Sequence, residues 1–204
     1  MRELIFATNN KGKLAEAKHF LEPLGYNVKS LSEIEITRFE PVEIGETFSD
    51  NALIKAKALL SIIPQACVFA DDSGLEVEAL GGRPGVLSAR YCEGTDNDRC
   101  LKILEEMKGI ENRKASFACA VAFYCQQVNF GLTARIDGEI GTELIGKNGF
   151  GYDPIFIRNG KSFAEISQEE KNNCSHRGAA LLQMAKILDD IVAKGLFLEV
   201  PHFE

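Results

Sequence analysis

Strand-like segments and a helical pattern follow one another at the start of the chain. Residues 4–7 form a short apolar run, and residues 26–31 also have the character of a strand. Between them, apolar side chains recur at helical spacing over residues 14–24. The polar segment 8–13, Thr-Asn-Asn-Lys-Gly-Lys, is therefore predicted to be a loop that joins a strand to a helix.

A second helix and a third strand are predicted next. The helix covers residues 47–64, because a T-x-x-D pattern precedes an apolar stripe that stops at a proline. Its polar side is expected to expose Lys55 and Lys57. The apolar run 67–70 predicts a buried strand, and the acidic pair Asp71-Asp72 is expected at the end of that strand.

The second half of the chain mixes strands and helices without a strict strand–helix–strand cycle. Residues 115–125 alternate in character, which predicts a long strand that is covered on both faces and central in its sheet. Residues 128–136 are its expected antiparallel partner, and 155–157 form a further strand. We therefore expect an α/β fold, a mixed twisted sheet with flanking helices. The remaining helices are predicted at 96–108, with Leu101, Leu104 and Met107 directed inward, and at 175–194, with Leu182 among its apolar positions and Gly195 closing it.

Composition and charge exclude several classes of protein. The 204 residues are 45% apolar and 26% charged, which is ordinary for a globular domain. The net charge of −7 argues against binding to the phosphate backbone of nucleic acids. No apolar run approaches the ~18 residues of a membrane helix, and the first residues lack the apolar segment of a signal peptide. We expect a single domain over residues 1–204, located in the cytoplasm, with neither nucleic acid nor membrane as a partner.

The six cysteines are predicted to be thiols. They contain no C-x-x-C pair, so neither a zinc site nor a disulfide framework is expected. Cys119 and Cys125 share one face of the predicted long strand, where small buried apolar side chains are a simpler interpretation than a redox pair. His19 and His202 are expected at the surface.

The segment Asp71-Asp72-Ser73-Gly74 is the strongest chemical signal in the sequence. Two adjacent acids after an apolar run are costly to hold near a core unless a cation or hydrogen-bond donors compensate them. Carboxylate oxygens are ligands that Mg²⁺ prefers, and strand alternation allows only one of the two acids to face a shared site. A solvated turn is the alternative. The acids Glu40, Glu43 and Glu46 allow the same metal hypothesis, although acids before a helix are also favoured by its dipole.

Cations and aromatic side chains gather beside glycines and helix starts. Lys11, Lys13 and Lys55 accompany loops or helix beginnings where backbone N–H groups attract phosphate, although Asn and Gly mark any turn. His176 and Arg177 open the last helix after Ser175, and they suit a base edge or a phosphate unless they are merely solvated. Lys171 is a further candidate cation for an anion site. The rings of Phe150 and Tyr152 either stack on a base or cover the core.

Taken together, these segments resemble the inosine/xanthosine triphosphate pyrophosphatase (Ham1-like) family. Its members hydrolyse non-standard purine nucleoside triphosphates to the monophosphate and pyrophosphate. The resemblance spans nearly the whole chain, and six motifs in order carry it. These motifs are FATNNKGK from Phe6, GETF from Gly45 with Asn51-Ala52, ADDSGL from Ala70, GRPG from Gly82 with SARY from Ser88, GFGYDP from Gly149, and Glu170-Lys171 followed by Ser175-His176-Arg177.

The resemblance implies an elongated two-lobed subunit with the active site in the cleft between the lobes, a homodimer, and Mg²⁺. It implies that Asp72 is the proton acceptor and a metal ligand, and that Lys55 faces the phosphates. The family often has an acid three residues before the glycine, where Val42 stands here, so Glu43 is the substitute metal ligand. The phosphates are assigned to Thr8, Asn9, Asn10, Lys11, Gly12, Lys13 and Ser73, and the nucleoside to Phe150, Gly151, Tyr152, Asp153, Lys171, His176 and Arg177.

The implied function is a hydrolase that removes ITP, dITP and XTP from the nucleotide pool. Two alternatives belong to other classes. A non-catalytic purine nucleotide sensor would keep the lysines and aromatic residues but would not need the carboxylate pair. A phosphomonoesterase of the aspartyl-phosphate type normally uses a D-x-D arrangement, whereas Asp71 and Asp72 are adjacent.

Overall fold

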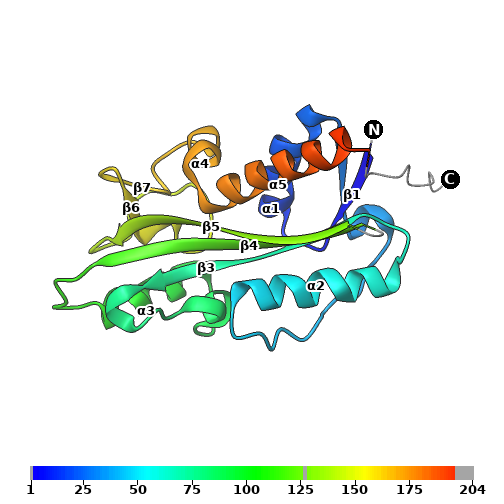
Figure 1. Cartoon of the computed structure of the whole chain (residues 1–204). Coiled ribbons are helices and arrows are strands. Elements are labelled where there is room, and N and C mark those ends of the chain that lie inside the picture. The colour runs from blue at the N-terminus through cyan, green and yellow to red at the C-terminus, as the bar shows by residue number, and fades with distance from the viewer. Residues whose placement is uncertain (1, 126–127, 196–204) are drawn as a thin grey trace. The chain divides into compact units, whose positions relative to one another are not determined.

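The computed structural model describes residues 2–125 and 128–195, which form a mixed seven-stranded sheet with flanking helices (Figure 1). Short 3₁₀ turns occupy Glu22–Leu24, Ser32–Ile34, Glu78–Leu80, Gly85–Arg90 and Asp153–Ile155. The strands are β1 (Arg2–Phe6), β2 (Tyr26–Ser30), β3 (Val68–Val77), β4 (Lys114–Cys125), β5 (Val128–Ile140), β6 (Phe156–Arg158) and β7 (Lys161–Ser162). The helices are α1 (Lys11–Leu21), α2 (Phe48–Ile62), α3 (Asp96–Glu106), α4 (Gln168–Cys174) and α5 (His176–Ala193).

The strand order confirms a mixed sheet with the predicted central strand. The order is β2-β1-β3-β4-β5-β6-β7, so β4 is the middle strand. Strand β1 runs parallel to β2 and to β3, with Phe6 opposite Phe69 in the second pairing. Strand β6 runs antiparallel to β5 and to β7. The nearly continuous burial of β4 agrees with a strand that is covered on both faces.

The chain divides into two compact units, each built from separate segments. The first contains the described parts of Met1–Asp72, Ala120–Thr133 and Gly178–Glu204, and the second contains Ser73–Cys119 and Ala134–Arg177. In the first unit, α1 and α5 cover one face of the strands and α2 covers the other (Figure 1). In the second, Phe117, Phe156 and Phe163 pack together in a core to which α3 contributes Cys100 and Ile103. Asp72 and Ser73 are thus consecutive residues of β3 that belong to different units.

Helix boundaries follow from side-chain caps. Thr47 caps α2 and exchanges hydrogen bonds with Asp50, which confirms the predicted T-x-x-D start. The chain leaves α5 through Gly195, whose φ of +67° suits the predicted helix end. One predicted inward residue is wrong, since Leu101 is 52% exposed. Leu182, an apolar position of the predicted last helix, is 46% exposed. In α3 the buried face is taken by Cys100 and Ile103 instead, because the helix presents a different stripe to the core.

The sequence predicted the acidic pair at the end of a strand, and this prediction is wrong. Strand β3 continues without a break from Val68 to Val77, so Asp71 and Asp72 occupy its middle and are 3% and 9% exposed. The strand continues because Ser73 and Gly74 adopt extended backbone, and Gly74 allows Ser88 to approach the strand closely. The solvated-turn alternative for this segment is therefore wrong.

The predicted free state of two cysteines is also wrong. Cys67 and Cys125 form a disulfide, while Cys92, Cys100, Cys119 and Cys174 are free thiols. Cys67 directly precedes β3 and Cys125 ends the neighbouring β4, so their Cα atoms are only 4.1 Å apart although 58 positions separate them in the sequence. Sequence spacing alone could not reveal this proximity.

The cysteines give a direct chemical test of the fold. We expect four of the six cysteines to react with a thiol reagent in the unfolded, unreduced protein, and all six after reduction. In the native protein Cys100 should resist alkylation at pH 8, because burial raises the pKa of its thiol to about 12. Peptide mapping of alkylated cysteines measures both expectations. Six reactive thiols without reductant would contradict the disulfide.

Two smaller predictions concern the surface. His19 is exposed, as expected, whereas His202 lies outside the described residues. Within residues 2–125 and 128–195, none of the helices combines the length and the apolar character that crossing a membrane requires.

Candidate functional site

A carboxylate–lysine cluster in the first unit is centred on Asp72. We use this name for Glu43, Asn51, Lys55 and Asp72. The Asp72 carboxylate accepts from Lys55 Nζ at 3.3 Å and from Asn51 Nδ2 at 3.1 Å, and both donors come from α2. Lys55 Nζ also lies 3.1 Å from Glu43 Oε1. The sequence prediction that Lys55 is exposed is therefore wrong: it is 9% exposed, because two carboxylates surround its ammonium.

Asp71 and Asp72 serve different partners because they are adjacent in an extended strand. Asp71 Oδ1 accepts from Lys13 Nζ at 3.0 Å, and Lys13 belongs to α1. Asp72 contacts α2 instead, and Figure 1 shows α1 and α2 on opposite faces of these strands. This confirms that only one of the two acids faces any given site.

The electrostatics of the carboxylate–lysine cluster favour a carboxylate that can accept a proton. Burial raises the pKa of Asp72 above its ordinary value, and attraction to Lys55 with the hydrogen bond from Asn51 offsets this only in part. Burial lowers the pKa of Lys55, but attraction to Asp72, Asp71 and Glu43 outweighs it, so the pKa of Lys55 is raised. Lys55 is therefore cationic at neutral pH, and Asp72 is a stronger base than an exposed aspartate.

The loop before α1 is shaped by its own hydrogen bonds. Asn10 is the N-cap of α1, with Oδ1 accepting from the backbone N–H of Lys13 at 3.1 Å. Thr8 Oγ1 in turn accepts from Asn10 N at 3.2 Å. Asn9 and Lys11 are exposed, whereas Thr8 is buried and Gly12 is half-buried. The segment therefore presents a helix N-terminus with cationic side chains beside it, as the anion-site hypothesis requires.

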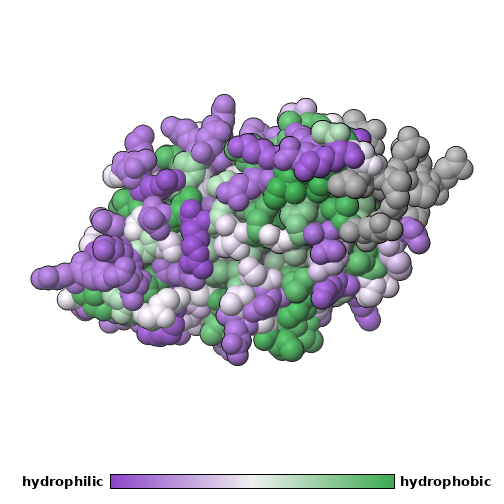
Figure 2. All heavy atoms as spheres, viewed as in Figure 1, coloured by the Kyte–Doolittle hydropathy of each residue, from purple (hydrophilic) through white to green (hydrophobic). Residues whose placement is uncertain are grey.

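The loop before α2 directs one acid toward Lys55. Glu43 lies against Lys55, while its neighbours Val42 and Ile44 are 76% and 78% exposed. Figure 2 shows apolar surface at the lower edge of the view, where this loop runs. Asn51 fixes the end of the loop, because its Oδ1 accepts from Gly45 N at 2.9 Å while its amide donates to Asp72. Asn51 belongs to the second of the six sequence motifs, but its residue type gives no indication of these contacts.

A basic–aromatic cluster lies in the second unit. We use this name for Phe150, Asp153, Lys171, His176 and Arg177. Lys171 Nζ lies 4.3 Å from the centroid of the Phe150 ring, and Arg177 Cζ lies 5.6 Å from the same centroid. Arg177 also donates to Ser73 Oγ at 2.8 Å. The cluster therefore brings together five of the residues assigned to the nucleoside, and Arg177 joins it to Ser73, which is assigned to the phosphates.

The basic side chains of the basic–aromatic cluster are buried, and Lys171 forms an ion pair with Asp153. Lys171 Nζ donates to Asp153 Oδ2 at 2.5 Å, and the two side chains are 4% and 3% exposed. The same carboxylate oxygen accepts from the backbone N–H of Phe150 at 2.8 Å. His176 stacks on Phe117 with 4.7 Å between the ring centroids. The interpretation of His176 and Arg177 as solvated residues is wrong, since they are 6% and 2% exposed.

Two residues that were assigned to the nucleoside, Tyr152 and Gly151, form hydrogen bonds within the protein instead. Tyr152 is 4% exposed and its hydroxyl donates to Ser88 O at 2.8 Å, so its ring covers the core rather than offering a stacking surface. Gly151 donates from its backbone N–H to Asp96 Oδ2 at 2.7 Å. These contacts fix the loop that carries Phe150, which leaves Phe150 as the aromatic residue of this loop that faces the basic side chains.

Comparison with known proteins assigns the chain to a family. Residues 4–187 match the sequence profile of the Ham1 family. The chain belongs to the Ham1 family. A curated relative from Bacillus subtilis strain 168, named dITP/XTP pyrophosphatase, is 46% identical over 93% of this chain and 98% of its own length. Two solved structures agree, each covering 93% of this chain: the Ham1 protein of Staphylococcus aureus (36% identity, TM-score 0.84, 99% of that chain) and a HAM1 protein of Coxiella burnetii (38%, 0.84, 100%).

The carboxylate–lysine cluster and the basic–aromatic cluster are the parts of this Ham1 chain whose side chains could bind or react with a ligand. The first offers a buried carboxylate with a raised pKa and one lysine, and the second offers buried cations around an aromatic ring. Among the described residues, no three His, Cys, Asp or Glu side chains are grouped closely enough to hold a metal ion by themselves. The chain can therefore supply cations for an anionic ligand, a proton acceptor, and a stacking surface.

Proposed function

We propose that this Ham1-family chain hydrolyses non-standard purine nucleoside triphosphates, namely ITP, dITP and XTP, to the monophosphate and pyrophosphate. The observation that carries the proposal is Asp72, a buried carboxylate with a raised pKa that is held by Lys55 and Asn51. A nucleotide sensor has no use for such a group. The dITP/XTP pyrophosphatase name of the Bacillus subtilis relative, which matches this chain almost from end to end, supports the same substrates.

We propose Mg²⁺ as the cofactor, with Asp72 and Glu43 as its protein ligands. Both carboxylates already contact one cation, the Lys55 ammonium, so their oxygens suit a hard cation as well. Two protein carboxylates are sufficient, because Mg²⁺ is ordinarily completed by water and substrate phosphates. When bound, the ion lowers the pKa of water and neutralises charge on the phosphates.

The residues of the first unit then have distinct roles in the reaction. Asp72 accepts the proton of the water that attacks the α-phosphorus, and the bond to pyrophosphate breaks. Lys55 holds Asp72 in place and places positive charge near the phosphates. The segment from Thr8 to Lys13 holds the leaving phosphates through the helix N-terminus, Lys11 and Lys13. Ser73, which follows Asp72 in β3 and belongs to the second unit, is a further hydroxyl assigned to the phosphates.

The residues of the second unit hold the nucleoside. Phe150 stacks on the base, and Lys171 with its partner Asp153 lies beside the ring. Arg177 and His176 donate to the 6-carbonyl that inosine and xanthosine share. Adenosine has an amino donor there and would leave two donors facing each other, which discriminates strongly between substrates. We retain the homodimer and the cytoplasmic location as predictions from the sequence and the family resemblance.

The test is the product released from each nucleotide. The purified full chain is incubated with ITP, XTP, dITP, ATP or GTP and Mg²⁺, and orthophosphate and pyrophosphate are quantified separately. We expect pyrophosphate from ITP, dITP and XTP, little from ATP or GTP, and none after the metal is chelated. Orthophosphate as the product would favour a phosphomonoesterase. Binding of ITP without any cleavage would favour a sensor.

A further inference from the structure

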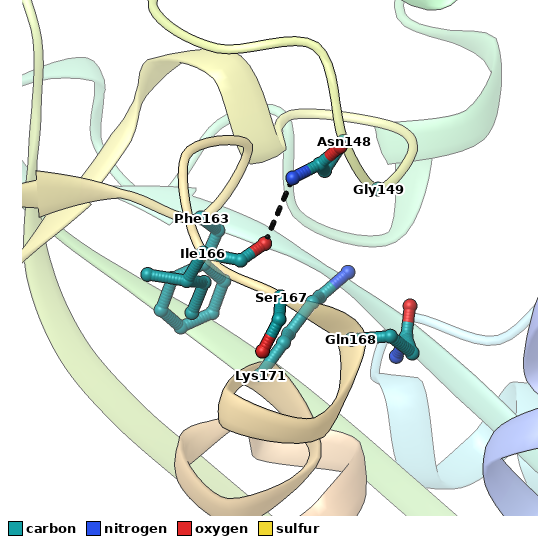
Figure 3. A pocket seen from close by; sticks show the side chains of 7 residues that line it. All are labelled: Asn148, Gly149, Phe163, Ile166, Ser167, Gln168 and Lys171. Carbon is teal, nitrogen blue, oxygen red and sulfur yellow. Dashed lines mark hydrogen bonds between the residues drawn. The ribbon is translucent and has the colours of Figure 1, made fainter.

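A cavity of about 330 Å³ lies beside the basic–aromatic cluster in the second unit (Figure 3). Its apolar lining comes from Phe163 and Ile166, and its polar lining includes Asn148 and Lys171. Ligand pockets ordinarily measure roughly 300–1,000 Å³, so this cavity has room for a flat ring but not for a whole nucleotide. Asn148, Phe163 and Ile166 take no part in the proposed binding of the nucleotide.

Lys171 belongs to both the cavity and the nucleoside site. Its side chain lines the cavity, while its ammonium pairs with Asp153 and lies 4.3 Å from the centroid of the Phe150 ring. Gly149, the residue before Phe150, forms another part of the lining. A purine stacked on Phe150 therefore has the cavity next to one of its edges.

Asn148 ties the two walls of the cavity together. Its Nδ2 donates to Ile166 O at 3.1 Å, the bond drawn as a dashed line in Figure 3, and its backbone N–H donates to Ala164 O at 3.0 Å. The next position requires glycine, because the φ of Gly149 is +75° and a Cβ there would collide with the Asp153 carboxylate. The Phe150 loop and the segment before α4 are thus joined by one side-chain hydrogen bond at the cavity, in addition to the backbone bonds to Ala164.

We propose that this cavity receives the C2 edge of the purine, and that Asn148 keeps it too narrow and too cationic for a 2-amino group. The proposal rests on the proposed function. Inosine carries hydrogen at C2, xanthosine a carbonyl and guanosine an amino group. The Lys171 ammonium can donate to a carbonyl, whereas an amino group would meet it donor to donor. Asp153 Oδ2 already accepts from Lys171 and from the backbone of Phe150. Asn148 is a positioning residue, since it acts through the placement of Lys171 and Phe150.

The test compares substrates that differ at C2. Full-length wild type and Asn148→Ala are assayed for kcat/KM with ITP, XTP and GTP. We expect the GTP-to-ITP ratio to rise about tenfold in the variant, because a widened pocket discriminates poorly against a small added group. Asn112→Ala is the matched control: it removes an asparagine hydrogen bond of the same unit, to Glu78 at 2.9 Å, away from the cavity, and should leave the ratio unchanged.

A second variant covers a failure of the first to fold. Ile166→Ala enlarges the cavity from its apolar wall without removing the Asn148 side chain, and it should raise the same ratio. Thermal melts establish that each variant is folded. If folded variants hydrolyse ITP with the wild-type GTP-to-ITP ratio, the assignment of the C2 edge is wrong while the proposed function stands. If the wild type releases no pyrophosphate from ITP, the proposed function itself fails.

Discussion

Asp72→Asn should lower the rate of pyrophosphate release from ITP by at least about 10³-fold. The substitution preserves the shape of the side chain but removes the proton acceptor and one of the two proposed metal ligands. General-base catalysis alone is worth about 10²–10⁴-fold, and the lost ligand adds to it. The measurement is single-turnover hydrolysis at saturating Mg²⁺, in which binding is separated from chemistry.

The same substitution should not reduce the free energy of unfolding. Because burial raises the pKa of Asp72 in the folded protein, its ionised form costs stability at neutral pH, a cost that is relieved as the pH falls through the raised value. The asparagine removes that cost, and Lys55 keeps its contact with Glu43. Loss of activity with an unchanged unfolding transition therefore identifies a chemical role.

Asp71→Asn is the matched control for Asp72→Asn. It neutralises the neighbouring carboxylate, which is also buried but accepts a hydrogen bond from Lys13 rather than from Lys55. We expect a loss of roughly tenfold, since the variant disturbs the placement of Lys13 but leaves Asp72 in place. A larger loss in Asp71→Asn than in Asp72→Asn would contradict the assignment of the proton acceptor.

Asp153→Ala should destabilise the protein by about 3–5 kcal/mol. It leaves the buried Lys171 ammonium without its carboxylate and removes the acceptor of the Phe150 N–H, and an uncompensated buried charge carries a cost of this size. Urea-induced unfolding, followed by circular dichroism, measures the change.

The double variant Asp153→Ala with Lys171→Met separates the buried charge from lost packing. Once the ammonium is replaced by an apolar side chain of similar length, we expect most of the lost stability to return. Equal destabilisation of the single and the double variant would mean that the ion pair is not the cause. Both variants should also bind nucleotide weakly, since each lacks a residue of the nucleoside site.

The sequence predicted most of the fold because its signals are local. The cap at Thr47, the alternation over residues 115–125 and Gly195 each determine an element from a few neighbouring residues. Local sequence patterns do not predict contacts between residues that are distant in the sequence. Leu101 belongs to a helix whose buried stripe is chosen by the core it meets, and Cys67 and Cys125 meet only through the strand order.

The sequence predicted which residues belong to the candidate site but not which of them contact one another. Asp72 and Lys55 stand out by their types and motifs, yet only the structure pairs them, because the contact joins β3 to α2. Asn51 carries no chemical signal of its own, since an asparagine within a helix is unremarkable until its amide is seen to hold Asp72 and Gly45. The contacts of Asn148 were hidden for the same reason.

The position of Asp71 and Asp72 in mid-strand also restricts which length changes β3 tolerates. Side chains of a strand alternate between faces, so inserting or deleting one residue between Phe69 and Asp71 would turn each acid toward the opposite helix. Lys13 and Lys55 would then each face either an apolar side chain of β3 or the carboxylate that now pairs with the other lysine. Related sequences should therefore vary in length before Cys67 or after Val77, while the spacing from Phe69 to Ser73 stays fixed even at positions that never touch a nucleotide.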